Sequence, residues 1–126
     1  MVWPVYAALL ALLFVALSIR TLRLRRRLRI AVGDGGNKTM LRTIRVHGNF
    51  SEYTPFALLL IMACESAQAP CLLVHALGIA LLAGRLIHAF GLSRDTEPFA
   101  LRVTGMALTF TCYLVAAAFL LWQALP

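Results

Sequence analysis

The chain has 126 residues, of which 61% are hydrophobic and 13% charged, whereas soluble domains average about 45–50% and 25%. This composition excludes an ordinary soluble domain and predicts a single-domain integral membrane protein. Lys and Arg outnumber Asp and Glu by twelve to five, a net charge of +7. The basic run at residues 20–29 adjoins an apolar segment and contains no aromatic residue, which favours membrane lipids over nucleic acid as its partner.

The first expected transmembrane helix covers residues 2–19. This stretch carries no charge, and as a helix it would be about 27 Å long, just enough to cross a bilayer. A cleaved signal peptide is disfavoured because the basic residues follow the apolar run and no small-x-small site separates them. Residues 20–41 then form a basic segment with a glycine-rich turn, after which Asn37 or Thr39 can cap the next helix.

The second expected helix, residues 40–65, has to take polar residues into the membrane. Its uninterrupted apolar part, Tyr53 to Cys64, would be only about 18 Å long, so the span has to begin near Ile44 to reach about 31 Å. The lengthened span takes in Arg45, Asn49 and Glu52. Together with Arg42 and Phe56 they lie on one stripe about 80° wide. Such a stripe costs several kcal/mol unless it is paired or lines a cavity, and therefore predicts a functional site. Pro55 predicts a kink just past it.

The third expected helix covers residues 70–91. Its small residues Ala76, Ala80 and Gly84 recur every fourth position and predict close packing against another helix. Near its end Arg85 and His88 lie one turn apart. Two readings of Arg85 stay open, a side chain that snorkels to the membrane surface and a member of the site.

The fourth expected helix covers residues 98–125, with Pro98 at its start. Four antiparallel spans would place Trp3 and Trp122 at the same membrane interface, as an aromatic belt requires. The fold class is therefore an all-α, integral membrane four-helix bundle. Seven of the basic residues lie between positions 20 and 41, which places that loop in the cytoplasm and both termini outside.

The three cysteines, Cys64, Cys71 and Cys112, have no metal-ligand spacing and lie among apolar residues. We expect them to be packing groups, and we expect no metal site. A disulfide between Cys64 and Cys71 stays open as an alternative.

The expected topology brings the polar residues of three helices to one depth on the cytoplasmic side. They are Arg42, Arg45, Asn49, Glu52, Arg85, His88 and Arg102. Four arginines against one glutamate leave positive charge near a low-dielectric region, which predicts an anionic ligand. The alternative is that some of these arginines reach phospholipid headgroups.

These residues form motifs that resemble the MAPEG family, the membrane-associated proteins in eicosanoid and glutathione metabolism. The motifs are the Gly-Asp-Gly-Gly turn at 33–36, residues 45–55 (RVHGNFSEYTP), residues 85–91 (RLIHAFG) and residues 101–105 (LRVTG). The resemblance covers essentially the whole chain and is strongest to short bacterial members. It implies a homotrimer in a bacterial inner membrane that binds glutathione between neighbouring subunits at the cytoplasmic end.

Residue by residue, Arg45, Asn49, Glu52 and Tyr53 match the positions that hold glutathione in the leukotriene-forming and prostaglandin-forming synthases. Glu52 can accept the ligand's ammonium group, Arg45 can bind a carboxylate, and Asn49 can both donate and accept. Arg102 resembles the arginine that is proposed to hold the glutathione thiolate. A cation there favours the thiolate, which is the nucleophile.

Other positions carry over less directly. His47 points about 200° away from Arg45 on a helical wheel, so we expect it to face another helix or the next subunit. His88 and Leu92 stand where the leukotriene-forming enzyme has tyrosines, so part of the ligand cradle differs. The basic residue that a neighbour contributes lies among residues 20–29, with Arg25 and Arg27 as candidates. Arg42 extends the stripe by one turn, as a ligand contact or a headgroup contact.

The sequence thus favours a glutathione-binding membrane protein, a glutathione transferase or peroxidase acting on a lipophilic small molecule that is electrophilic. The alternative is a non-catalytic membrane scaffold, lipid-binding module or accessory subunit with the same fold. A proton-coupled transporter is less favoured because the four spans show no inverted repeat.

Overall fold

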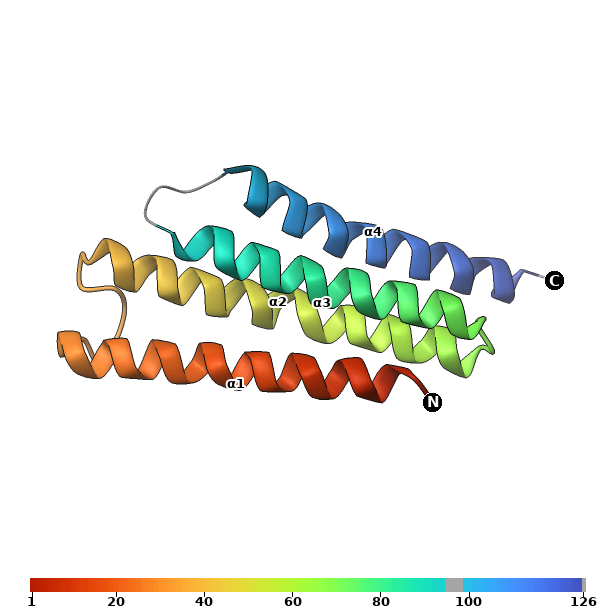
Figure 1. Ribbon diagram of the computed structural model, residues 1–126, viewed down its shortest axis with the longest axis horizontal. Coiled ribbons are helices and arrows are strands. Elements are labelled where there is room, and N and C mark those ends of the chain that lie inside the picture. Colours follow the sequence, from red (N-terminus) through yellow and green to blue (C-terminus); the bar gives the residue numbers. More distant parts are fainter. Residues whose placement is uncertain (95–98, 126) are drawn as a thin grey trace.

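The computed structural model describes residues 1–94 and 99–125 and shows an all-α, four-helix membrane bundle. The helices are α1 (Trp3–Leu28), α2 (Lys38–Ser66), α3 (Cys71–Ser93) and α4 (Phe99–Ala124). They lie side by side in alternating directions, and both ends of the chain are at the same end of the bundle (Figure 1). The predicted fold class is confirmed.

Three of the helices, α1, α3 and α4, are long and apolar enough to cross a membrane. The remaining helix, α2, has 29 residues and carries the polar stripe in its first half. It packs against each of the other three helices. Its apolar residues alone would not span a bilayer, so its polar residues are held at membrane depth by the length of the bundle.

The first helix continues well past Ile19 and ends at Leu28, so the expected end was wrong. The basic run is helical because leucine and arginine are both good helix formers and because cations stabilise a helix C-terminus. The helix stops at Arg29, whose φ of 57° is left-handed. Asn37, the first of the two expected caps, accepts a hydrogen bond from the backbone N–H of Met40 at 2.9 Å.

Helices α3 and α4 pack closely against each other at two glycines. A Cβ atom on Gly84 would lie 2.9 Å from the carbonyl oxygen of Gly105, and one on Gly105 would lie 2.7 Å from that of Gly84. Gly84, one of the three small residues of the expected ridge, lies in this contact, whereas Ala76 is exposed and Ala80 half-buried. The ridge prediction is therefore confirmed at Gly84.

The cysteines are free thiols, so the alternative of a Cys64–Cys71 disulfide is not realised. Cys64 and Cys112 are buried packing groups, as expected. Cys71 is exposed because it begins α3, where the side chain lies beyond the packed part of the bundle. Among residues 1–94 and 99–125 no cluster of three His, Cys, Asp or Glu side chains is arranged to hold a metal ion.

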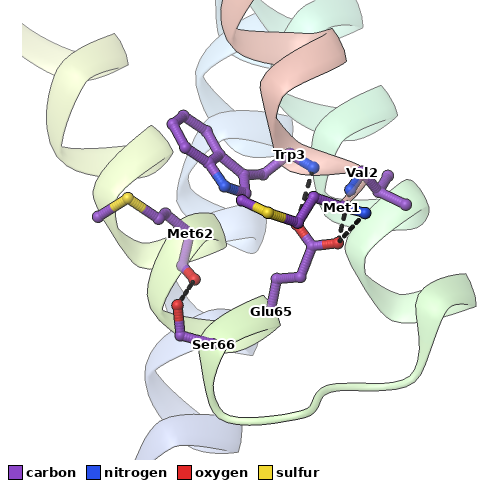
Figure 2. A network of polar contacts seen from close by, with 6 residues as sticks. All are labelled: Met1, Val2, Trp3, Met62, Glu65 and Ser66. Atoms are coloured by element: carbon purple, nitrogen blue, oxygen red, sulfur yellow. Dashed lines mark hydrogen bonds and ion pairs between the residues drawn. The ribbon is translucent and has the colours of Figure 1, made fainter.

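The start of α1 is attached to the end of α2 by one carboxylate. Glu65 accepts hydrogen bonds from the backbone N–H groups of Val2, at 2.5 Å, and Trp3, at 3.0 Å (Figure 2). The amino group of Met1 lies 3.9 Å from the same side chain. These N–H groups have no partner within the helix, so Glu65 supplies the acceptor that the first turn of α1 lacks.

The loop between α3 and α4 includes residues 95–98, which fall outside the described part of the chain. The expected helix start at Pro98 lies among them.

Candidate functional site

A buried arginine organises the polar layer between α2, α3 and α4. Arg85 on α3 is only 1% exposed. One guanidinium nitrogen, Nη1, donates to Asn49 Oδ1 on α2 at 2.7 Å. The other, Nη2, donates to Thr109 Oγ1 on α4 at 2.7 Å and lies 3.3 Å from the sulfur of Met106. The snorkelling alternative is thus excluded, because the guanidinium is directed into the bundle.

The described side chains that contact the Arg85 guanidinium are neutral. Its ring neighbour is Tyr53, with the guanidinium carbon 5.8 Å from the ring centroid. The remaining nitrogen, Nε, has no hydrogen-bond partner among the described residues. A buried guanidinium held only by an amide, a hydroxyl, a thioether and a ring keeps a strong positive field in the layer.

The bond from Arg85 fixes the orientation of the Asn49 amide. Guanidinium groups have donors and no acceptor, so the atom of Asn49 that faces Arg85 has to be its oxygen. The NH₂ group of Asn49 is therefore left as the group available to a ligand. This amide lines two adjoining cavities.

The first cavity has a volume of about 230 Å³, and its lining is about half polar. Its lining residues come from α2, α3 and α4 and are Leu41, Arg42, Arg45, Asn49, His88, Leu92 and Arg102. Five of the predicted site residues therefore surround one space. This convergence matches the depth argument made from the sequence.

The second cavity has a volume of about 390 Å³ and shares Asn49, His88 and Arg102 with the first. Its other walls are apolar side chains of α4, namely Phe99, Val103, Met106, Ala107 and Phe110. The two cavities together form a site with a cationic end and an apolar end. Such a site can accept an anionic molecule next to a lipophilic one.

Two predicted residues, Glu52 and Tyr53, lie deeper along α2 and outside both cavity linings. Glu52 Oε1 is 3.9 Å from Arg45 Nη1, and both side chains are about half exposed, at 54% and 57%. Such an exposed pair contributes little to stability and leaves both groups accessible. The ring of Tyr53 packs edge-on against Phe110 at 5.8 Å.

Two further lining residues, Arg42 and His88, also contact other parts of the bundle. Arg42 Nη1 donates to the backbone carbonyl of Arg94, just after α3, at 2.6 Å. His88 is buried against the α3–α4 contact, since a Cβ atom on Gly105 would lie 2.7 Å from its Cβ. Arg42 and His88 thus each join a cavity wall to the packing of the bundle.

His47 faces α1, as the helical wheel predicted. Its Nε2 is 3.0 Å from the hydroxyl of Ser18, and its ring stacks on Phe14 at 5.0 Å. The candidates on the basic run, Arg25 and Arg27, line neither of these two cavities. Arg25 donates to the carbonyl of Gly33 at 2.9 Å, and Arg27 lines a separate groove beside α2.

Sequence reasoning missed Thr109 and Met106 as partners of Arg85. A signal was present, since residues 102, 106 and 109 follow one another at helical spacings of four and three and share a face of α4. The apolar wall at Phe99, Val103 and Phe110 had no such signal. Apolar side chains that face a cavity resemble those that face lipid.

The fold and the site define an all-α integral membrane bundle with an arginine-centred polar layer inside it. The sequence profile described as the MAPEG family matches residues 3–122, and the chain belongs to this family. It is 41% identical over 122 residues to "Inner membrane protein YecN" of Escherichia coli strain K12. The aligned residues make up 97% of this chain and 92% of that protein. The protein of the same name from E. coli O6:H1 strain CFT073 matches to the same extent. No solved structure gives a significant match.

Proposed function

We propose that this protein binds glutathione and acts as a membrane glutathione transferase or peroxidase on lipophilic electrophiles. The observation that carries the proposal is the joined pair of cavities, cationic at one end and apolar at the other, around Asn49, His88 and Arg102. Glutathione has two carboxylates and a thiol, and a lipophilic electrophile would enter from the bilayer. Family membership supports the same assignment.

In this proposal each residue binds the group of glutathione that complements its charge or hydrogen-bonding capacity. Arg45, which lines the polar cavity and is 57% exposed, binds a carboxylate of glutathione. Glu52, 3.9 Å from it, accepts the ligand's ammonium group, and Tyr53 borders the same stretch of α2. Asn49 donates through its NH₂ group. These four residues are the glutathione-binding set that we propose.

Arg102 is the residue that we propose for the chemical step, because it lies where the polar and apolar cavities meet. Bound glutathione supplies the thiolate that attacks an electrophilic carbon, forming a carbon–sulfur bond as the leaving group departs with its electron pair. The guanidinium of Arg102 stabilises the thiolate and so raises its population. His88, buried beside it, shapes the same junction.

A homotrimer completes the site in this proposal. Arg45 and Glu52 are about half exposed in the protomer, and a neighbouring subunit covers them. Of the two candidates on the basic run, Arg25 is the residue that we assign to the neighbour's site. Arg27 lines the groove between α1 and α2, whereas Arg25 lies in a different groove, where it donates to the carbonyl of Gly33. We further propose a bacterial inner membrane location, with the α1–α2 loop cytoplasmic and both termini outside, since the relatives are named inner membrane proteins.

The test is glutathione binding to the purified full-length protein in detergent, measured by calorimetry and by thermal unfolding. Arg45→Ala is expected to weaken binding by about 1.5–3 kcal/mol, the value of a charge-assisted hydrogen bond. Lys38→Ala removes a cation from the same helix outside the cavities and is expected to leave affinity unchanged. An unfolding temperature that does not respond to excess glutathione would contradict the proposal and favour a non-catalytic scaffold.

A further inference from the structure

A second groove lies between α1 and α2, at the end of the bundle where α1 becomes basic. Its volume is about 570 Å³, and it shares no lining residue with the cavities around Asn49. Three arginines of α1 form one wall, namely Arg20, Arg23 and Arg27. Their spacing of three and four residues places them on one face of the helix.

The arginines of this wall have no acidic partner among residues 1–94 and 99–125. Arg23 and Arg27 are exposed, and no carboxylate of the described residues forms an ion pair with either. Arg20 is half-buried and donates to the hydroxyl of Ser93 on α3, a neutral acceptor. The groove therefore concentrates positive charge at a fixed position.

The opposite wall adds to the positive field. It is formed by Thr39 and Thr43 in the first two turns of α2, and this helix start has no acidic side chain in its first turn. The N-terminus of a helix carries a partial positive charge from its unpaired N–H groups. Arginine side chains and the α2 helix dipole thus act on the same space.

The floor of the groove is apolar and continues into the membrane span. It is formed by Ala16, Ile19 and Leu24. Arg20 is the first charged residue after the uncharged stretch that begins at Val2. The arginines therefore lie at the depth of the lipid headgroups, with the apolar floor directed toward the acyl chains.

We propose that this groove binds the phosphodiester headgroup of an anionic phospholipid. Arg23 and Arg27 bind the phosphate oxygens through their forked donors, and the upper part of an acyl chain lies on Ala16 and Ile19. A soluble phosphate compound would use the arginines and leave the apolar floor uncovered. This site is independent of glutathione binding and can be tested without it.

The experiment is native mass spectrometry of the full-length protein in detergent, titrated with phosphatidylglycerol and, separately, with phosphatidylcholine. We expect a retained phosphatidylglycerol on each chain and weaker retention of phosphatidylcholine. Arg23→Gln combined with Arg27→Gln is expected to weaken phosphatidylglycerol binding about fivefold for each arginine removed. The matched control, Arg26→Gln with Arg29→Gln, makes the same charge change at residues that line a different groove and is expected to leave binding nearly unchanged.

Three results would overturn the proposal. Equal losses in the two double variants would mean diffuse attraction to the basic run. Equally tight binding of glycerol phosphate would mean a soluble phosphate site. A loss of oligomer mass in Arg23→Gln/Arg27→Gln would mean that the groove is a contact between subunits.

Arg23→Lys is a further variant that tests the site without removing charge from the basic run. It keeps the cation and removes the forked donor geometry of the guanidinium, so it is expected to fold normally and to bind phosphatidylglycerol with intermediate affinity.

Discussion

The guanidinium of Arg85 on α3 donates a 2.7 Å hydrogen bond to the side-chain oxygen of Asn49 on α2. This bond gives Asn49 two separate roles, because its oxygen supports the fold and its NH₂ group remains for a ligand. A buried donor without an acceptor costs about 1–3 kcal/mol. The two roles can therefore be separated by substitution.

Asn49→Leu removes both groups and Asn49→Asp removes only the donor. We expect Asn49→Leu to lower the free energy of unfolding by about 1–3 kcal/mol, because Arg85 Nη1 loses its acceptor. Asn49→Asp keeps an acceptor and adds a charge that pairs with Arg85, so stability is expected to be retained while glutathione affinity falls. Thermal unfolding in detergent and calorimetry measure the two effects. If Asn49→Asp bound glutathione as tightly as the wild type, the amide would have no ligand role.

The contact between Gly84 and Gly105 predicts a second effect on stability. A methyl group on Gly105 would lie 2.7 Å from both a backbone oxygen and the His88 backbone nitrogen, and these atoms cannot move without separating α3 from α4. Gly105→Ala is expected to lower the free energy of unfolding by about 1–3 kcal/mol. Gly48→Ala is the control, because a Cβ there meets only Glu52 Oε1 at an ordinary 3.8 Å. That variant is expected to be neutral or up to about 1 kcal/mol more stable.

The sequence predicted the fold because span length and charge distribution leave few arrangements for a chain this short. It also predicted that His47 faces another helix or the next subunit, since this residue lies about 200° from Arg45 on a helical wheel. It placed the end of α1 too early because a loss of hydropathy at Arg20 is not a loss of helix propensity. Hydropathy marks where a helix leaves the membrane, and the helix itself continues.

The residues of the polar layer were predicted as a set, but the hydrogen bonds that Arg85 forms within it were not. Arg85 has the same spacing to His88 whether it snorkels or turns inward. The choice depends on Asn49 and Thr109, which lie on two other helices and supply the acceptors. Which side chains pair across three helices depends on how each helix is rotated about its own axis. Hydropathy and residue spacing in a single sequence do not determine these rotations.

The hydrogen bonds that the start of α1 donates to Glu65 predict a local effect on stability at the end of the bundle that holds both chain termini. Glu65→Ala removes the acceptor of the Val2 and Trp3 N–H groups. We expect faster hydrogen exchange at these two amides and a stability loss of about 1 kcal/mol. Glu52→Ala is the matched control, since its exposed pairing with Arg45 is expected to contribute almost nothing to stability. Unchanged exchange at Val2 and Trp3 would show that Glu65 does not hold α1.

Arg102 lies at the junction of the polar and apolar cavities, which predicts an effect on rate that is separable from binding. Arg102→Ala is expected to reduce thiolate formation and to slow conjugation of a lipophilic test electrophile about 10- to 100-fold, as loss of about 1.5–3 kcal/mol from one charged contact implies. Arg102→Lys keeps the cation and is expected to recover part of the rate. Arg94→Ala removes an exposed cation outside both cavities and is expected to leave the rate unchanged.

Single-turnover kinetics, with thiolate absorbance followed at saturating glutathione, measure the chemical step alone. An unaltered rate in Arg102→Ala would remove this residue from the mechanism, while the binding proposal for Arg45 and Asn49 would stand on its own test.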